Sequence, residues 1–217
     1  MCFSFVASVA AGATLSAAGV LTVKLARRRT ELPLALLPLL FGVQQLTEGV
    51  VWWSLDHGAP TLNGASTFAY MLFSHVLWPV FVPFAFLCLE PVQWRRTVLS
   101  VCLGVGAVVA CHGLLTVMRG PSSSHIVGRS IQYELPSWFI VALYLLATCI
   151  GAFFSSRSVI RALGVTALAL ALLTLWLYAA VFVSVWCFFS AVLTIVIFVY
   201  FLLSRQGSSR SRRPMLA

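Results

Sequence analysis

The sequence contains very little charge. Only 9% of its 217 residues are Asp, Glu, Lys or Arg, whereas ordinary globular domains have about 25%, and 61% of the residues are hydrophobic. A soluble core of this size has no room for so much apolar surface. The composition therefore excludes an ordinary water-soluble domain and predicts that lipid is the solvent.

Three further absences exclude particular kinds of site. The six cysteines are scattered singly, without a CxxC pair or a Cys/His zinc spacing, so neither a disulfide framework nor a structural zinc site is indicated. The only lysine, Lys24, ends the first apolar segment, so the last span has no lysine for a retinal Schiff base. The last three apolar segments contain no histidine and therefore lack the HxxxH pattern of membrane metal-hydrolases of the ceramidase and progestin-receptor type.

What the sequence does contain is a series of apolar segments. Each is close to the roughly 20 residues that cross about 30 Å of hydrocarbon. We predict an all-α integral membrane bundle of seven transmembrane helices over residues 1–204, followed by a basic, disordered cytoplasmic tail over residues 205–217. The division between the last two spans is the least marked, because the sequence there is almost unbroken apolar. The predicted spans are Phe3–Val23, Leu32–Leu55, Thr67–Leu89, Val98–Met118, Ser137–Phe154, Leu163–Val181 and Val185–Leu203.

The basic residues predict the orientation. With the N-terminus outside and the C-terminus inside, 12 of the 14 Lys and Arg residues face the cytoplasm, and only Arg119 and Arg129 lie outside. The cluster KLARRR follows the first apolar run, so that run reads as a span and not as a signal peptide. We therefore expect a multi-pass protein of the cytoplasmic (inner) membrane. Its charge of +9 then reflects topology and contact with anionic lipid headgroups, and not nucleic acid, whose footprint is one clustered basic surface.

A polar face interrupts the second predicted span. Gln44 and Glu48 are four residues apart and Gln45 and Glu48 three apart, so on a helix all three share one face. An ionisable residue at membrane depth is costly, and it marks a functional site by default. The alternative is that Glu48 is a protonated or Gln-bonded residue that only holds helices together.

Two histidines are expected at the same depth as Glu48. At 1.5 Å per residue, Glu48 lies about 10 Å below the outer edge of its span, His75 about 12 Å and His112 about 9 Å. The three therefore fall in one layer of the outer half of the membrane. Each histidine has the alternative of being a hydrogen-bonded residue between helices and not a ligand.

A proline and a row of small residues lie near these histidines. Pro79 cannot donate to the carbonyl of His75, so the helix is expected to kink there, either to shape a binding site or only to shape packing. In the next span, Gly106, Ala110 and Gly113 share one side, about 120° around the helix from His112. That side is predicted to pack closely against a neighbour.

Two features at the membrane surfaces have simpler interpretations. Glu90 is expected to form an interfacial ion pair with Arg95 and Arg96. In the longest outer loop, RGPSSSHIVGRSIQYELP, the segment IQYELP is expected to pack back on the bundle.

Several motifs together resemble one family. The segments MCFSFVAS, QQLTEGVVW, WPVFVP with Glu90, IQYE and SVWCFFSA are similar to those of an uncharacterised family of small bacterial polytopic membrane proteins that begin Met-Cys-Phe-Ser. The likeness spans residues 1 to about 191, and it implies no known activity. A histidine expected in the outer loop is replaced here by Arg129 and Ser130, so no loop-histidine role is expected. The resemblance directs attention to Cys2, Gln45, Glu48, Trp78, Pro79, Trp186 and Cys187.

The resemblance leaves several roles open for Cys2 and Cys187. Both lie near the outer ends of their predicted spans, where oxidising conditions allow a disulfide. A soft-metal or haem site built from cysteine, histidine and glutamate is a second option. Two thiols that pack as small apolar groups are a third, and Cys2 as an N-terminal nucleophile is a fourth. The metal-ligand set under this hypothesis is Glu48, His75, His112, Cys2 and Cys187.

Three functions follow as competing hypotheses. The first is binding or transport of a small ligand or ion in an outer-half pocket built from Gln44, Gln45, Glu48, His75, His112 and Trp78. The second is an integral-membrane enzyme that depends on a metal ion or haem, with Glu48 as acid or base. The third is a structural or accessory subunit whose polar residues only join helices. Convergence of the polar faces of the second, third and fourth spans distinguishes the first two from the third.

Overall fold

Helices make up almost all of the described chain. A computed structural model describes residues 4–120, 124–133 and 137–210, and side chains as far as residue 205. The fold is all-α, as predicted, apart from one short hairpin of β1 (His125–Val127) and β2 (Ser130–Gln132). Gly128 in its turn has φ 62°, a conformation that strains residues with a Cβ atom.

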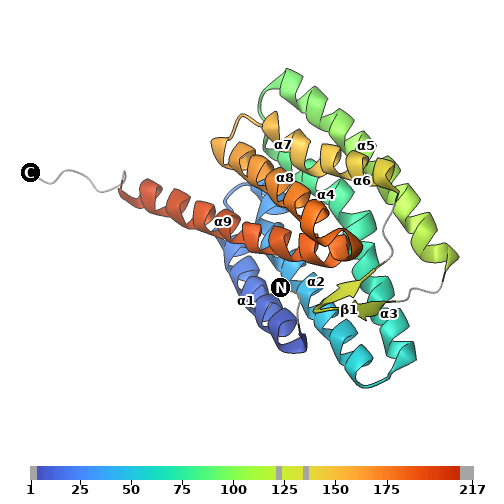
Figure 1. Cartoon of the computed structure of the whole chain (residues 1–217). Coiled ribbons are helices and arrows are strands. Elements are labelled where there is room, and N and C mark those ends of the chain that lie inside the picture. The colour runs from blue at the N-terminus through green and yellow to red at the C-terminus, as the bar shows by residue number, and fades with distance from the viewer. Residues whose placement is uncertain (1–3, 121–123, 134–136, 211–217) are drawn as a thin grey trace, which may run out of the picture.

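The helices run back and forth along one bundle (Figure 1). Two of the rods contain a π-helix: α3, η2 and α4 are continuous, and so are α6, η3 and α7. The helical elements are α1 (Phe5–Leu25), η1 (Arg29–Glu31), α2 (Leu32–Asp56), α3 (Pro60–Met71), η2 (Leu72–Leu77), α4 (Trp78–Leu89), α5 (Gln93–Arg119), α6 (Trp138–Leu145), η3 (Leu146–Ile150), α7 (Gly151–Phe153), α8 (Ser158–Tyr178), η4 (Ala179–Val181) and α9 (Phe182–Arg210).

Five helical segments within the described residues are long and apolar enough to cross a membrane. The segment Trp138–Phe153 is apolar but shorter, and Ser158–Arg205 is one helical run of 48 residues. That run bends at Tyr178, whose φ of −136° and ψ of 36° are not helical, and α8 then packs against α9. The bend precedes the predicted boundary by a few residues. Helix α9 also continues to Arg210, into the segment predicted as a disordered tail.

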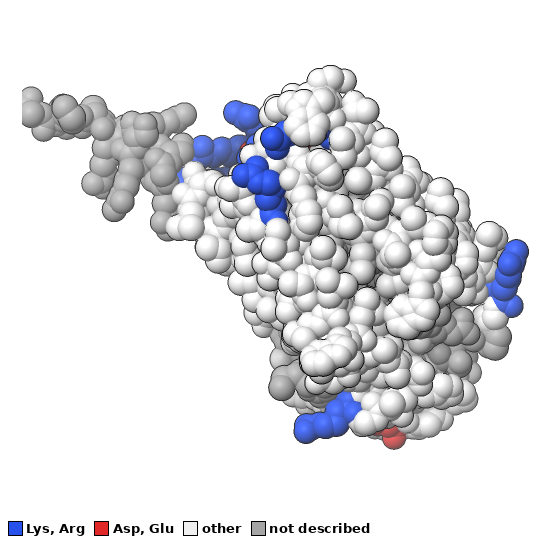
Figure 2. Space-filling model, turned by 45° about the horizontal axis from the view of Figure 1, so that its top comes forward, with Lys and Arg blue, Asp and Glu red and all other residues white. Residues whose placement is uncertain are grey.

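The two ends of the bundle have different chemistry. At one end, here called the basic end, Arg205 donates to the backbone carbonyl of Lys24 at 2.9 Å, and Arg157 donates to the Tyr200 hydroxyl at 2.7 Å. These bonds join the last turns of α1 and α9 to the start of α8. On the face shown in Figure 2, Lys and Arg gather mainly at this end, and the surface between the two ends carries no charge.

At the other end, the hairpin end, the loop strands pack on the helices. Asn63 donates to Ser124 at 2.9 Å, and the Tyr133 ring stacks on Tyr70 with centroids 4.4 Å apart. Ile131 and Tyr133 are buried. The expectation that IQYELP packs back on the bundle is therefore confirmed for its described part, and residues 134–136 lie outside the described residues.

The prediction for Glu90 is wrong. Its side chain is buried, and one carboxylate oxygen accepts from the backbone N–H of Ser156 at 2.7 Å and from the Ser155 hydroxyl at 3.4 Å. Arg95 and Arg96 donate instead to backbone carbonyls. The loop between α7 and α8 brings free N–H groups to the carboxylate, so Glu90 ties that loop to the end of α4.

Helix α5 packs closely on the rod that contains the π-helix. A Cβ atom on Gly113 would lie 2.6 Å from the His75 carbonyl oxygen, and one on Gly106 would collide with the Pro79 carbonyl. Ala110 on the same side is also buried. The predicted small-residue face is confirmed, and it covers the backbone that Pro79 and the π-helix leave irregular.

Two glycines of α5 make a matched test of this packing. We expect Gly106→Ala to destabilise the protein by about 1–3 kcal/mol, because the added methyl group has no space against α4. Gly104→Ala on the same helix meets no atom within 4 Å and should leave stability unchanged or raise it by up to about 1 kcal/mol. Thermal unfolding in detergent measures both. Equal melting temperatures would contradict the close α4–α5 contact.

Candidate functional site

The polar face of α2 points into the bundle. Gln44, Gln45 and Glu48 are each 0% exposed, although the surrounding helices are apolar. The expectation that the three share one face agrees with their common burial. A buried polar group needs a partner, so the neighbours of these side chains decide what the face can do.

Trp78 holds one end of the cluster. Its indole Nε1 donates to Gln44 Oε1 at 2.7 Å, and its ring stacks on Phe41 with centroids 3.8 Å apart. Trp78 is the first residue of α4, directly after the π-helix, so the change in helical register helps to set where the indole points. The resemblance directed attention to Trp78, and the structure places it in the cluster.

Glu48 joins α2 to α9. The Ser184 hydroxyl donates to Glu48 Oε1 at 2.7 Å, and Gln45 Nε2 donates to Glu48 Oε2 at 3.4 Å. Ser184 is 0% exposed and lies 136 residues from Glu48 in the chain. Sequence reasoning missed Ser184, because a serine in an apolar span gives no signal of its partner.

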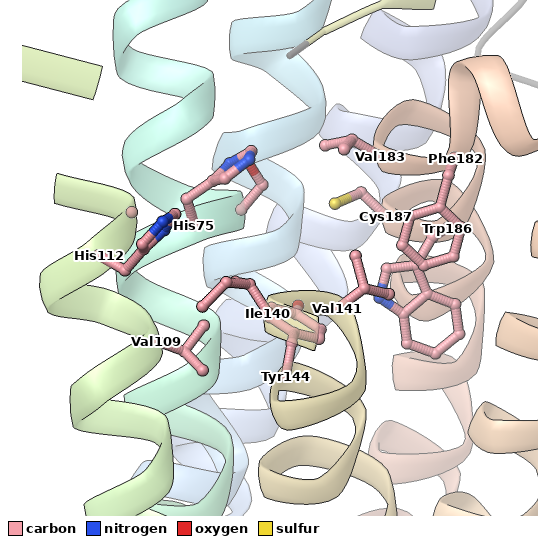
Figure 3. A pocket seen from close by; sticks show the side chains of 12 residues that line it. His75, Val109, His112, Ile140, Val141, Tyr144, Phe182, Val183, Trp186 and Cys187 are labelled. Carbon is pink, nitrogen blue, oxygen red and sulfur yellow. The ribbon is translucent and has the colours of Figure 1, made fainter. Parts of the chain in front are cut away.

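A small cavity, here called the histidine cavity, lies beside this cluster. Its volume is about 40 Å³. Figure 3 shows His75 and His112 on one side of it and Cys187 and Trp186 on the other. The lining comes from four elements and comprises Ser74 and His75 of η2, Val109, His112 and Gly113 of α5, Ile140, Val141 and Tyr144 of α6, and Phe182, Val183, Trp186 and Cys187 of α9.

The two predicted histidines do share one cavity, in different surroundings. His75 is 5% exposed, and its Nδ1 lies 2.7 Å from the Ser74 hydroxyl. His112 is exposed at the surface of α5. The cavity therefore reaches from the outside of the bundle at His112 to a buried histidine.

Cys187 connects the cavity with the polar cluster. The buried thiol lines the cavity, and the side chains of Tyr70 and Gln44 lie within hydrogen-bonding range of it, with Glu48 close by. Cys2 lies outside the described residues, so a disulfide between Cys2 and Cys187 stays a prediction.

The structure brings together only part of the predicted metal-ligand set. In the described portion of the chain, no three residues among His, Cys, Asp and Glu are close enough to hold a metal ion. Glu48, His75, His112 and Cys187 surround the same region without forming such a group, and the fifth member, Cys2, is not described.

The motifs that surround the cluster and the cavity are those of a single family. A family model matches residues 1–213, which include every residue of the site. The chain belongs to DUF6629, a family of unknown function. This confirms the resemblance to an uncharacterised family. No curated protein and no solved structure matches the chain significantly. For a member of DUF6629, the chemistry of the site must therefore be argued from its own residues.

The bond between Ser184 and Glu48 can be tested by stability. We expect Ser184→Ala to lower the free energy of unfolding by about 1–3 kcal/mol, because it removes a donor from a buried carboxyl group. Ser204→Ala is the matched control on α9, since the Ser204 hydroxyl is exposed and bonds its own helix at Tyr200. Thermal unfolding in detergent gives both values. A loss no larger at Ser184 than at Ser204 would show that the bond contributes nothing.

Proposed function

We propose that this DUF6629 protein is a seven-span membrane protein with its N-terminus outside and its C-terminus in the cytoplasm. Three observations support it. Helix α8 bends back at Tyr178, so one long apolar run supplies two spans. The shorter helix Trp138–Phe153 passes through the same bundle between the hairpin end and the basic end. The basic end gathers most of the Lys and Arg, which the positive-inside rule assigns to the cytoplasm, where they meet anionic lipid headgroups.

Labelling of introduced thiols tests this topology. In a chain without native cysteines, Arg129→Cys should react with a membrane-impermeant maleimide in intact cells, because the hairpin faces outward. Arg29→Cys should react only after permeabilisation, because it lies at the basic end. The reverse pattern would invert the proposed orientation, and labelling of both positions in intact cells would contradict the odd number of spans.

Within this topology we propose that the protein binds a proton or a small monovalent cation at Glu48, in the outer half of the membrane. The single observation that carries the proposal is a carboxyl group that is 0% exposed among apolar helices. A bare carboxylate in such surroundings is strongly disfavoured, so it is expected to take up a proton or a counter-ion.

The side chains around Glu48 suit a group that changes its charge. Ser184 and Gln45 donate to the two carboxylate oxygens, which stabilises the charged form. Gln45 Oε1 has no hydrogen-bond partner among the described residues. Because an amide carries a donor and an acceptor at opposite corners, a half-turn of Gln45 would let it accept a proton from the carboxylic acid. The same side chain therefore serves both states.

The size of the histidine cavity limits the ligand. A volume of about 40 Å³ has room for about one to three water molecules, whereas pockets for organic ligands measure about 300–1,000 Å³. Cys187 lies between this cavity and Glu48, and His112 opens it to the surface. These features favour a proton or a water-sized ion over an organic solute. The metal- or haem-dependent enzyme lacks a comparable supporting observation.

Infrared difference spectroscopy tests the proton at Glu48. We expect the wild-type protein in lipid to show a carboxylic-acid C=O band that disappears as the pH rises. Glu48→Gln should lose this band, while Glu31→Gln should keep it, because Glu31 accepts only from the nearby backbone at the basic end. Sodium or lithium that abolishes the band at constant pH would identify the small cation as the ligand.

The same spectra distinguish the structural alternative. If Glu48→Gln and wild type give the same difference spectrum at every pH and salt concentration, Glu48 takes up neither proton nor cation. It would then only join α2 to α9 through Ser184.

A further inference from the structure

A second cavity continues from the first inside the bundle. This threonine cavity has a volume of about 80 Å³. It lies toward the basic end, enclosed by α2, α4, η3, α8 and α9. The polar side chains in its lining are Thr148, Cys149, Ser190 and Thr194.

Two aromatic residues separate the cavities. Tyr144 and Trp186 line both the histidine cavity and the threonine cavity, so together they form the wall between them. The Tyr144 hydroxyl lies within hydrogen-bonding range of the Trp186 indole. Figure 3 shows the two side chains approaching each other from α6 and α9. Rotation of one ring is therefore enough to join the two cavities.

Each cavity has a π-helix in its wall. Helix η2 carries Ser74 and His75 at the histidine cavity, and η3 carries Thr148 and Cys149 at the threonine cavity. A π-helix interrupts the regular hydrogen-bond ladder of a helix, and such interruptions concentrate at functional sites. Both therefore occur where the two cavities need a local change in backbone direction.

The threonine cavity presents oxygen atoms without charge. Thr148 Oγ1 donates to the Tyr144 carbonyl at 2.8 Å and Thr194 Oγ1 to the Ala191 carbonyl at 2.6 Å. Each hydroxyl proton is thereby used within its own helix, and the oxygen lone pairs are left as acceptors. Neutral oxygen acceptors in a space for a few waters suit a hydrated proton or a water-sized cation.

The structure is closed on both sides of the threonine cavity. Tyr144 and Trp186 close it toward the histidine cavity, and Leu37, Phe86 and Ile197 bound it toward the basic end. Beyond these residues the core is solid, with Leu34, Leu89 and Phe201 all buried. A through path therefore needs movement at both closures.

We propose that the two cavities are successive parts of one path for protons and water-sized monovalent cations, with Tyr144 and Trp186 as its gate. The identity of the ion rests on the proposed binding at Glu48, whereas the existence of the path does not. Glu48, beside Cys187 at the first cavity, is then the loading site, and Cys149 marks the space beyond the gate.

The native cysteines allow a direct test with silver ion. Ag⁺ forms a bond to a thiol sulfur and releases the thiol proton, so modification reports passage of a small cation. In a chain whose only cysteine is Cys149, held in lipid nanodiscs, Trp186→Ala should raise the rate of modification about tenfold or more, the effect of removing about 1.4 kcal/mol from an opening free energy. A chain with only Cys187 should react with Ag⁺ faster than the Cys149 chain when both keep Trp186.

Cys102 is the control thiol. It is as buried as the others but packs against Gly151 outside both cavities. Faster reaction at Cys149 without a change at Cys102 supports the gate. No change at Cys149, or an equal rise at both cysteines, would overturn it, because equal rises mean that Trp186→Ala loosens the whole bundle. Trp186→Phe, which keeps most of the ring volume, should show the same pattern with a smaller rise.

Proton flow into proteoliposomes separates the path from the ion-binding site. Trp186→Ala should increase the flow under an imposed membrane potential, and adding Glu48→Gln should reduce it again. If Cys149 becomes reachable while Glu48→Gln has no effect on flow, the path stands and the proposed role of Glu48 fails. If Ag⁺ never reaches Cys149, the path fails whatever Glu48 binds.

Discussion

The burial of one carboxyl group among apolar helices is the constraint on which the rest of this structure depends. Glu48 is 0% exposed, so its oxygens must find donors inside the protein. Ser184 on α9 and Gln45 on α2 supply them, and this draws the first and last thirds of the chain together. Such a group is costly if it is only a clamp, because apolar residues pack helices at lower risk. The proposed exchange of a proton or cation gives the burial a purpose.

The surroundings of Glu48 depend in turn on irregular backbone. The π-helix η2 and Pro79 change the register of one rod, so that Trp78 meets Gln44 and His75 meets the histidine cavity. Gly106 and Gly113 let α5 cover that irregular backbone closely. Because a lipid-exposed break would leave backbone groups unsatisfied, the glycine face of α5 and the break in its neighbour form one device.

Much of the site could be predicted from spacing alone. The positions of Gln44, Gln45 and Glu48 on one face follow from helical periodicity, and a count of residues from the membrane surface placed both histidines near one another. The small-residue face of α5 was found in the same way. The error over Glu90 has a different origin, because proximity to Arg95 and Arg96 along the chain does not reveal that backbone N–H groups from the loop after α7 are better placed. Ser184 and Tyr144 were missed because single hydroxyl groups in apolar spans carry no pattern.

The sequence by itself determined that this protein is helical and apolar, which of its residues are polar at depth and which end of the bundle is basic. These properties depend on composition and on the period of one helix, so local physics is sufficient. Only the tertiary structure decided that Ser184 bonds Glu48, that Cys187 stands between that carboxyl and the histidine cavity, and that Tyr144 and Trp186 divide two cavities. Those contacts join helices far apart in the chain, and their rotation about one another is set by side-chain packing that no single helix contains.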